Sequence, residues 1–299
     1  NFALKGTFFA SQRSRRHIIT TQIEHPAIAA RCRFLECLDA EITWLPVDGT
    51  GRMNPDDLRR AITADTILVS IMHANNEVGT IQPIEECAAI ARAHGIAFHT
   101  DAAQSVGKIS SRVDDLGVDL LSIAGHKLYA PKGVGALYVR KGMALEPLIH
   151  GAGHEGGWRA GTESAMLAAA LGEACVLASD TAAMERVRAL RDRFWDALQF
   201  HFGPAVVLNG HPLHRLPNTL NVSFVNRNGA DILARLDGVA ASTGSACHAG
   251  RIELSPVLKA MGVPPEIGMG AVRFSLGRST TAEEIDEVVE LLTKSRPAT

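Results

Sequence analysis

Short apolar runs alternate with stretches of helical periodicity along the first part of the chain. Each run has the length of one strand and is almost wholly apolar, which is typical of strands covered on both faces. The predicted strands span residues 18–21, 42–47, 66–72, 96–99, 118–123 and 135–139, and the helices between them span about 24–38, 55–62 and 83–94. This alternation predicts an α/β fold, with a mostly parallel sheet and helices on both of its faces.

The pattern changes after two predicted helices at 164–178 and 181–202. Short strands are predicted at 206–208, 219–224 and 272–276, and further helices at 230–236 and 283–292. This mixture predicts a smaller α+β domain in the second part of the chain. We therefore expect a large domain over residues 1–182 and a smaller C-terminal domain over residues 183–299.

Composition narrows the class of protein. The chain has 299 residues, of which 46% are hydrophobic and 21% charged, as in ordinary soluble enzymes. A net charge of −2 gives no support for binding nucleic acid or an anionic membrane, and no apolar run approaches the ~20 residues of a membrane span. The five cysteines form no CxxC pair, so we expect reduced thiols and a cytoplasmic location. No signal peptide and no metal site are predicted.

Three polar residues, Asn76, Asp101 and Lys127, each follow the end of a predicted strand. Because ligands bind at the carboxyl ends of parallel strands, we expect these residues to share a site. A partly buried lysine loses hydration and its pKa falls, which suits an amine that forms a Schiff base. The ordinary alternatives are a surface lysine in a Gly/Pro turn, a helix N-cap for Asp101 and a turn residue for Asn76.

Three other residues carry possible chemistry. His25 opens a predicted helix, where a lone histidine usually caps or packs. Arg273 shares a strand face with Ser275, which favours a surface arginine, although a guanidinium also binds carboxylates in a bidentate way. Cys247 lies among small residues at 241–250, which predicts a mobile, exposed loop, whereas most free cysteines are buried and inert. The glycine-rich residues 151–162 predict a second functional loop.

Residues 122–140, SIAGHKLYAPKGVGALYVR, resemble the cofactor-lysine segment of the cysteine desulfurases, pyridoxal-phosphate enzymes of the class V aminotransferase group. The resemblance runs in the family's order from residues 18–21 to 273–278, and the stretch around Cys247 is similar to the family's nucleophile loop. The word Ala-Cys-His and residues 255–258 also resemble selenocysteine lyases. The family's N-terminal phosphate loop is expected to be missing before Asn1, and Ala124 replaces a hydroxyl of many relatives.

The resemblance implies a pyridoxal 5'-phosphate site of seven residues, of which five would act around the ring and its aldehyde. Lys127 would hold the cofactor covalently and move the Cα proton of the substrate. Asp101 would pair with the protonated pyridine nitrogen, and Gln104 would bond the phenolic oxygen. His25 would stack on the ring and help to move protons, and Asn76 would contact the ring oxygen and the substrate carboxylate.

The remaining roles concern the phosphate, the substrate and the sulfur. His126 and Thr162 would contact phosphate, with Thr162 reaching the neighbouring subunit of a homodimer, and Arg273 would clamp the substrate carboxylate. Cys247 would take the sulfur of L-cysteine as a persulfide, leave L-alanine, and pass the sulfur to an acceptor such as an iron-sulfur scaffold protein. Two alternatives stay open: a selenocysteine lyase acting on L-selenocysteine, and a truncated, non-catalytic dimer partner.

Overall fold

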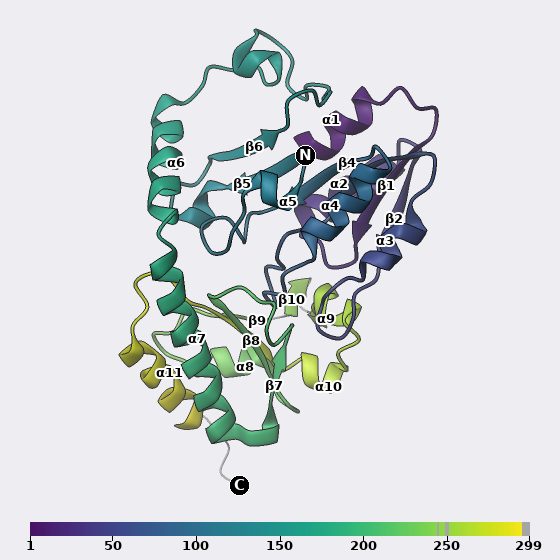
Figure 1. Ribbon diagram of the computed structural model, residues 1–299. Coiled ribbons are helices and arrows are strands. Elements are labelled where there is room, and N and C mark those ends of the chain that lie inside the picture. Colours follow the sequence, from purple (N-terminus) through teal and green to yellow (C-terminus); the bar gives the residue numbers. More distant parts are fainter. Residues whose placement is uncertain (244, 249–250, 295–299) are drawn as a thin grey trace. The chain divides into compact units, whose positions relative to one another are not determined.

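The computed structural model describes residues 1–243, 245–248 and 251–294; the side chains of residues 181 and 244–252 also lie outside the description. The chain divides into two compact units (Figure 1). The larger consists of residues 1–47, 53–75 and 82–180, and the smaller of residues 48–52, 76–81 and 181–299. Two short segments that we expected in the first domain, 48–52 and 76–81, thus belong to the smaller unit.

The larger unit is built on a six-stranded sheet with the order β2-β1-β3-β4-β5-β6. Its strands are β1 (Arg16–Thr21), β2 (Ala40–Leu45), β3 (Thr66–Ser70), β4 (Ala97–Asp101), β5 (Leu120–Ala124) and β6 (Gly135–Val139). The first five strands are parallel, and β6 runs antiparallel to β5 at one edge. The predicted α/β class with a mostly parallel sheet is confirmed.

Helices cover both faces of this sheet because successive strand residues point to opposite sides. The helices are α1 (Phe2–Ala10), α2 (Pro26–Glu36), α3 (Pro55–Ala61), α4 (Ile84–Ala93) and α5 (Val113–Leu116). Ile18 packs with residues of α1 and α2. Its neighbour Ile19 packs with residues of α3, α4 and α5 on the other face. The same division separates Leu120 from Leu121.

The larger unit also contains two short 3₁₀ helices, η1 (Gly125–Leu128) and η2 (His154–Gly157), and the helix α6 (Ala165–Ala178). Only Ala174 is buried along α6, and Met166, Val176 and Leu177 are 80%, 66% and 59% exposed. A helix that is apolar all round normally lies inside a protein or at an interface. The surface of α6 is therefore unusually apolar for an exposed helix.

The smaller unit has a four-stranded antiparallel sheet with the order β7-β8-β12-β9. Its strands are β7 (Val206–Asn209), β8 (Thr219–Phe224), β9 (Ser242–Thr243) and β12 (Ala271–Ser275), and its helices are α7 (Thr181–Phe202), η3 (Gly203–Ala205), α8 (Gly229–Leu233), α9 (Pro256–Ala260), α10 (Pro265–Gly268) and α11 (Ala282–Lys294). The sheet packs against α7 and α11 in one core. Within it Phe194 and Phe274 meet edge to face, with ring centroids 4.9 Å apart.

The segment predicted as a loop at 241–250 contains regular structure instead. After β9, the strands β10 (Ser245–His248) and β11 (Arg251–Leu254) form an antiparallel pair in which Cys247 lies opposite Ile252. The loop prediction is therefore wrong for this part, because ladder hydrogen bonds to a neighbouring segment outweigh a composition of small residues. The exposure and mobility expected for the Cys247 side chain lie outside the described residues.

Among the described residues, no single helix is both long and apolar enough to cross a membrane. In the same described residues, one bent pair, α6 followed by α7 with η3, reaches such a length and composition when its two members are taken together.

Candidate active site

The carboxyl ends of neighbouring parallel strands form the candidate site of the larger unit. Asp101 is the last residue of β4, and Lys127 lies in η1, directly after β5. Because β4 and β5 are paired with Asp101 opposite Ser122, the two functional groups come from adjacent strand ends. His25 follows the end of β1, which only β3 separates from β4. The structure thus brings Asp101, Lys127 and His25 to one edge of the sheet.

Lys127 is exposed, so the expectation of a partly buried lysine is wrong. The strand β5 ends at Ala124, and the 3₁₀ turn that follows carries the side chain beyond the buried part of the sheet. Gly125 allows this turn, because a Cβ there would lie 2.8 Å from the Val134 carbonyl oxygen. The consequence is an amine that a ligand can reach without rearrangement of the core.

A second lysine, Lys108, lies near Lys127 and was not singled out from the sequence. Its Nζ donates a hydrogen bond to the backbone oxygen of Gln104 over 2.8 Å. Burial and, to a smaller extent, the positive charge of Lys127 together lower the pKa of Lys108 to about 8. The sequence does not indicate that Lys108 lies near Lys127, because the fold of the turn after β4 brings the two lysines together.

Asp101 is half-buried, and its Oδ1 accepts a hydrogen bond from the backbone N–H of Ala103 over 2.9 Å. This is a local turn contact rather than the helix N-cap of the ordinary alternative, because residues 103–108 form a turn and no helix begins there. Within the described residues Oδ2 makes no hydrogen bond, so the carboxylate keeps one oxygen for a ligand. Gln104 is also half-buried, and its backbone oxygen accepts the hydrogen bond from Lys108 Nζ.

A buried histidine, His99, lies two residues before Asp101 on the same face of β4. Its Nδ1 lies 2.8 Å from Ser70 Oγ, and its Nε2 lies 2.9 Å from Ser122 Oγ. These contacts join β3, β4 and β5. Burial lowers the pKa of His99 to about 3, so the ring is neutral and one nitrogen donates while the other accepts.

Glu24 is a buried carboxyl group that sequence reasoning missed. It is only 7% exposed, and its Oε1 accepts hydrogen bonds from Thr21 Oγ1 over 2.7 Å and from the Met72 backbone N–H over 2.9 Å. Burial, with a smaller contribution from the charge of Asp101, raises its pKa to about 8, although the hydrogen bonds from Met72 and Thr21 act in the opposite direction. The one feature of the sequence that could have drawn attention to Glu24 is its position directly before His25.

The histidines and the threonine of the predicted site are exposed. His25 is the N-cap of α2, and its Nδ1 accepts a hydrogen bond from the Ala27 backbone N–H over 3.1 Å. This is the capping role that the ordinary alternative predicts, and it leaves the proton of the neutral ring on Nε2. His126 precedes Lys127 in η1, and Thr162 lies in the irregular segment after η2. Their contacts with phosphate stay predictions.

In the smaller unit the structure joins the two predicted substrate-binding residues. Arg273 Nη1 donates to the backbone oxygen of Asn76 over 2.8 Å, and Nη2 donates to Ser242 Oγ over 3.1 Å. The side chain of Arg273 is half-buried rather than surface-facing. Its Nε is buried and has no hydrogen-bond partner within the described residues, so the guanidinium retains donor capacity.

A neighbouring acid, Glu77, tunes the charge around Arg273. Burial raises the pKa of Glu77, whereas its hydrogen bond from Ser255 and the charge of Arg273 lower it. The side chain of Cys247, the predicted nucleophile, lies outside the described residues.

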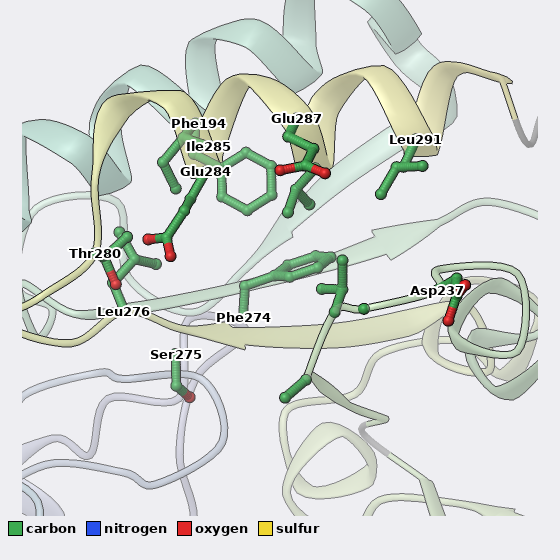
Figure 2. A pocket seen from close by; sticks show the side chains of 14 residues that line it. Phe194, Asp237, Phe274, Ser275, Leu276, Thr280, Glu284, Ile285, Glu287 and Leu291 are labelled. Atoms are coloured by element: carbon green, nitrogen blue, oxygen red, sulfur yellow. The ribbon is translucent and has the colours of Figure 1, made fainter.

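The smaller unit also contains a hollow that these residues do not line. A hollow of ≈300 Å³ in the smaller unit lies between β12 and α11 (Figure 2). It is lined by Phe274 and Leu276 on one side and by Ile285 and Leu291 on the other, and no predicted site residue contributes to it. No group of three or more metal-ligating side chains occurs among the described residues.

The sequence comparisons identify relatives over nearly the whole chain. The aminotransferase class-V family matches residues 1–288. A cysteine desulfurase IscS of Dictyoglomus turgidum is 50% identical over 296 residues, which cover 98% of this chain and 75% of that protein. A cysteine desulfurase IscS of Methanosarcina thermophila is 48% identical over 298 residues, covering 98% of this chain and 73% of that protein.

Solved structures agree with this result. A NifS-like protein aligns with a TM-score of 0.91 at 35% identity, over 98% of this chain and 78% of that one. A structure described as SspA in complex with cysteine aligns with a TM-score of 0.80 at 36% identity, over 92% and 78% of the two chains. The family resemblance predicted from the sequence is confirmed. The chain belongs to the aminotransferase class-V family and, within it, to the cysteine desulfurases.

Proposed function

We propose that this chain uses pyridoxal 5'-phosphate to convert L-cysteine to L-alanine, with the sulfur held as a persulfide on Cys247. The observation that carries the proposal is the placement of an accessible amine, Lys127, and a carboxylate, Asp101, at adjacent ends of β5 and β4. This donor set fits the cofactor, because an aldehyde needs an amine and a pyridinium nitrogen needs an anion.

The larger unit would hold the cofactor. Lys127 Nζ would bind its aldehyde carbon, Oδ2 of Asp101 would keep its ring nitrogen protonated, and Gln104 and His126 would contact its oxygens. When bound, pyridoxal phosphate supplies an electron sink that stabilises negative charge at the substrate Cα. Lys127 Nζ, once released, would take the Cα proton, and His25 would use Nε2 to move protons beside it.

The smaller unit would supply the groups that act on the substrate. Arg273 would bind the cysteine carboxylate through its unpaired donor capacity, next to Asn76. The Cys247 thiolate would attack the substrate sulfur, so that an S–S bond forms as the Cβ–S bond breaks. The electrons of the broken bond stay on the three-carbon fragment, and a proton added at Cβ gives alanine. A thiol of an acceptor protein, such as an iron-sulfur scaffold, would then take the terminal sulfur.

The apolar surface of α6 supports the expected homodimer. Met166, Val176 and Leu177 are exposed on one helix of the larger unit, and a second copy would remove this apolar surface from water. Thr162 lies just before this helix, in agreement with its predicted contact with the phosphate of the neighbouring subunit.

Replacement of the nucleophile tests the proposed function. In Cys247→Ser the hydroxyl stays protonated at neutral pH and holds no persulfide, so alanine formation from cysteine should stop while cofactor binding persists. Cys37→Ser is the matched control, because Cys37 is an exposed free cysteine in the larger unit and should keep wild-type turnover. Alanine release and the mass of the persulfide measure the outcome.

Two results would count against this proposal. If Cys247→Ser formed alanine at the wild-type rate, Cys247 would not be the nucleophile. Faster turnover of selenocysteine than of cysteine, unaffected by Cys247→Ser, would favour the selenocysteine lyase, because a selenolate leaves more readily than a thiolate.

A further inference from the structure

The turn that presents His25 is tied to a neighbouring segment by buried side chains. Glu24 Oε1 accepts the backbone N–H of Met72 over 2.9 Å, and Asn75 Nδ2 donates to the backbone oxygen of Ile23 over 3.0 Å. Both of these side chains are buried, and Asn75 is fully so. Residues 72–75 therefore lie along the turn between β1 and α2 and hold it at two points.

The same segment is also bound to the end of β4. The backbone N–H of His73 donates to the carbonyl oxygen of Asp101 over 2.9 Å. Residues 72–75 thus connect the turn that carries His25 with the strand end that carries Asp101. Glu24 stands at the first of these connections, and Thr21 Oγ1 donates to the same Oε1 atom over 2.7 Å.

Glu24 has further properties that a surface side chain lacks. Its Oε2 is buried and has no hydrogen-bond partner within the described residues. With the carboxyl pKa raised to about 8, chiefly by burial, the group is mostly a neutral acid at pH 7. A neutral acid keeps Oε1 as an acceptor for Met72 without placing an unpaired charge near Asp101. The sequence reasoning gave Glu24 no part in the reaction.

We propose that Glu24 is a positioning residue that acts through His25, by fastening the turn of residues 21–25 to residues 72–75. The inference rests on the proposed function, because it concerns the histidine expected over the cofactor ring. His25 can present Nε2 in one direction only while its Nδ1 caps α2, and the cap in turn depends on where the preceding residue is held. Glu24 supplies that restraint.

Two substitutions of Glu24 test whether its acceptor oxygen or its ability to carry a charge holds the turn. Glu24→Leu keeps an apolar fit but leaves the Met72 N–H without an acceptor, so the turn should shift. We expect kcat to fall by about tenfold to a hundredfold, with little change in the KM for cysteine because Arg273 is untouched. Glu24→Gln retains an acceptor oxygen and is neutral, so it should recover most of the lost rate.

His17→Leu is the matched control. His17 is also buried on β1, where its ring bonds Thr66 Oγ1 over 2.8 Å and Thr43 Oγ1 over 2.9 Å, but at the opposite end of the strand from His25. It should lose stability comparably to Glu24→Leu and keep the wild-type kcat. Equal losses of kcat in the two variants would show that general destabilisation, not positioning, explains the effect.

A double-mutant cycle tests whether Glu24 acts through His25. In a His25→Ala background, Glu24→Leu should cost no further rate, because the group that it positions is gone. Full additivity of the two losses would overturn the proposal.

A second measurement needs no cofactor. In protein labelled with ¹⁵N-histidine, the His25 signal, assigned by its absence from His25→Ala, should show Nδ1 as an acceptor in the wild type and in His17→Leu. In Glu24→Leu it should shift toward the values of free imidazole. An unchanged signal in that variant would overturn the proposal. A wild type that makes no alanine from cysteine would refute the proposed function, while these spectra would still report on Glu24.

Discussion

At the scale of single residues, burial decides which polar groups near the sheet edge can change charge. Glu24 and His99 are both buried in the larger unit, and burial favours the neutral form of each. It therefore raises the pKa of the acid to about 8 and lowers that of the histidine to about 3. The pKa of Glu24 lies above its ordinary value and the pKa of His99 lies below its own. Each group therefore makes the stability depend on pH over a different range.

His99→Gln should weaken the acid sensitivity of the protein. The folded pKa of about 3 lies below the ordinary value of 6.5, so the unfolded chain binds a proton that the native state excludes. The stability present above pH 6.5 is therefore lost as the pH falls toward 3. Glutamine does not titrate, so the variant lacks this loss. Glu24 makes the stability fall as the pH rises from 4.5 to about 8. Because both proteins contain Glu24, its effect cancels in the comparison.

Urea denaturation at pH 8 and pH 4 measures this difference. At pH 8 the variant should be less stable by about 1–3 kcal/mol, because the bonds to Ser70 and Ser122 are imperfectly replaced. Between the two pH values it should lose less stability than the wild type. Parallel losses in the two proteins would show that His99 is protonated in the folded state.

At the scale of elements, the site depends on how β5 ends. The 3₁₀ helix η1 turns directly under the backbone of residue 134, and Gly125 N–H donates to the Val134 carbonyl oxygen over 3.0 Å. A side chain at this position has no room, since its Cβ would lie 2.8 Å from that oxygen. This close backbone contact therefore fixes the start of the turn that carries Lys127.

Gly125→Ala should therefore displace η1 and impair binding of the cofactor by Lys127. We expect much lower cofactor content, read as visible absorbance per chain, together with a stability loss of about 1–3 kcal/mol. Gly172→Ala is the control, because a Cβ at that position in α6 meets nothing within 4 Å. It should keep the cofactor content and gain up to about 1 kcal/mol from helix propensity. Normal cofactor content in Gly125→Ala would contradict this account of the turn.

At the scale of the whole molecule, the exposed apolar surface of α6 bears on assembly. Met166 is 80% exposed on α6, and Phe200 is 85% exposed on α7 in the smaller unit. The two side chains are alike in size and exposure but belong to different surfaces. Among the helices of the described residues, α6 alone carries several large exposed apolar side chains.

Met166→Glu should convert the expected dimer to a monomer, because a charge would be buried against apolar groups at the interface. Phe200→Glu should leave the dimer intact. Sedimentation equilibrium of the two variants and the wild type measures the difference. A wild type that sediments as a monomer, or a dimeric Met166→Glu, would refute the α6 interface.

The sequence by itself determined the class of fold and the family. Apolar runs of strand length, separated by helical periodicity, depend on local side-chain order, and every strand of the parallel sheet was predicted close to its observed bounds. The positions of Asp101 and Lys127 just past strand ends were also readable, because parallel strands present their carboxyl ends at one edge.

Only the tertiary structure decided burial and partnership between distant segments. It exposed Lys127, buried Glu24 against the backbone of Met72, joined Arg273 to the carbonyl of Asn76 and paired Cys247 with Ile252. None of these contacts has a local pattern, because each depends on which segments the packed core brings together and on how much water it excludes. The periodicity of apolar residues is a property of one segment, whereas solvation and hydrogen-bond partners are properties of the folded chain.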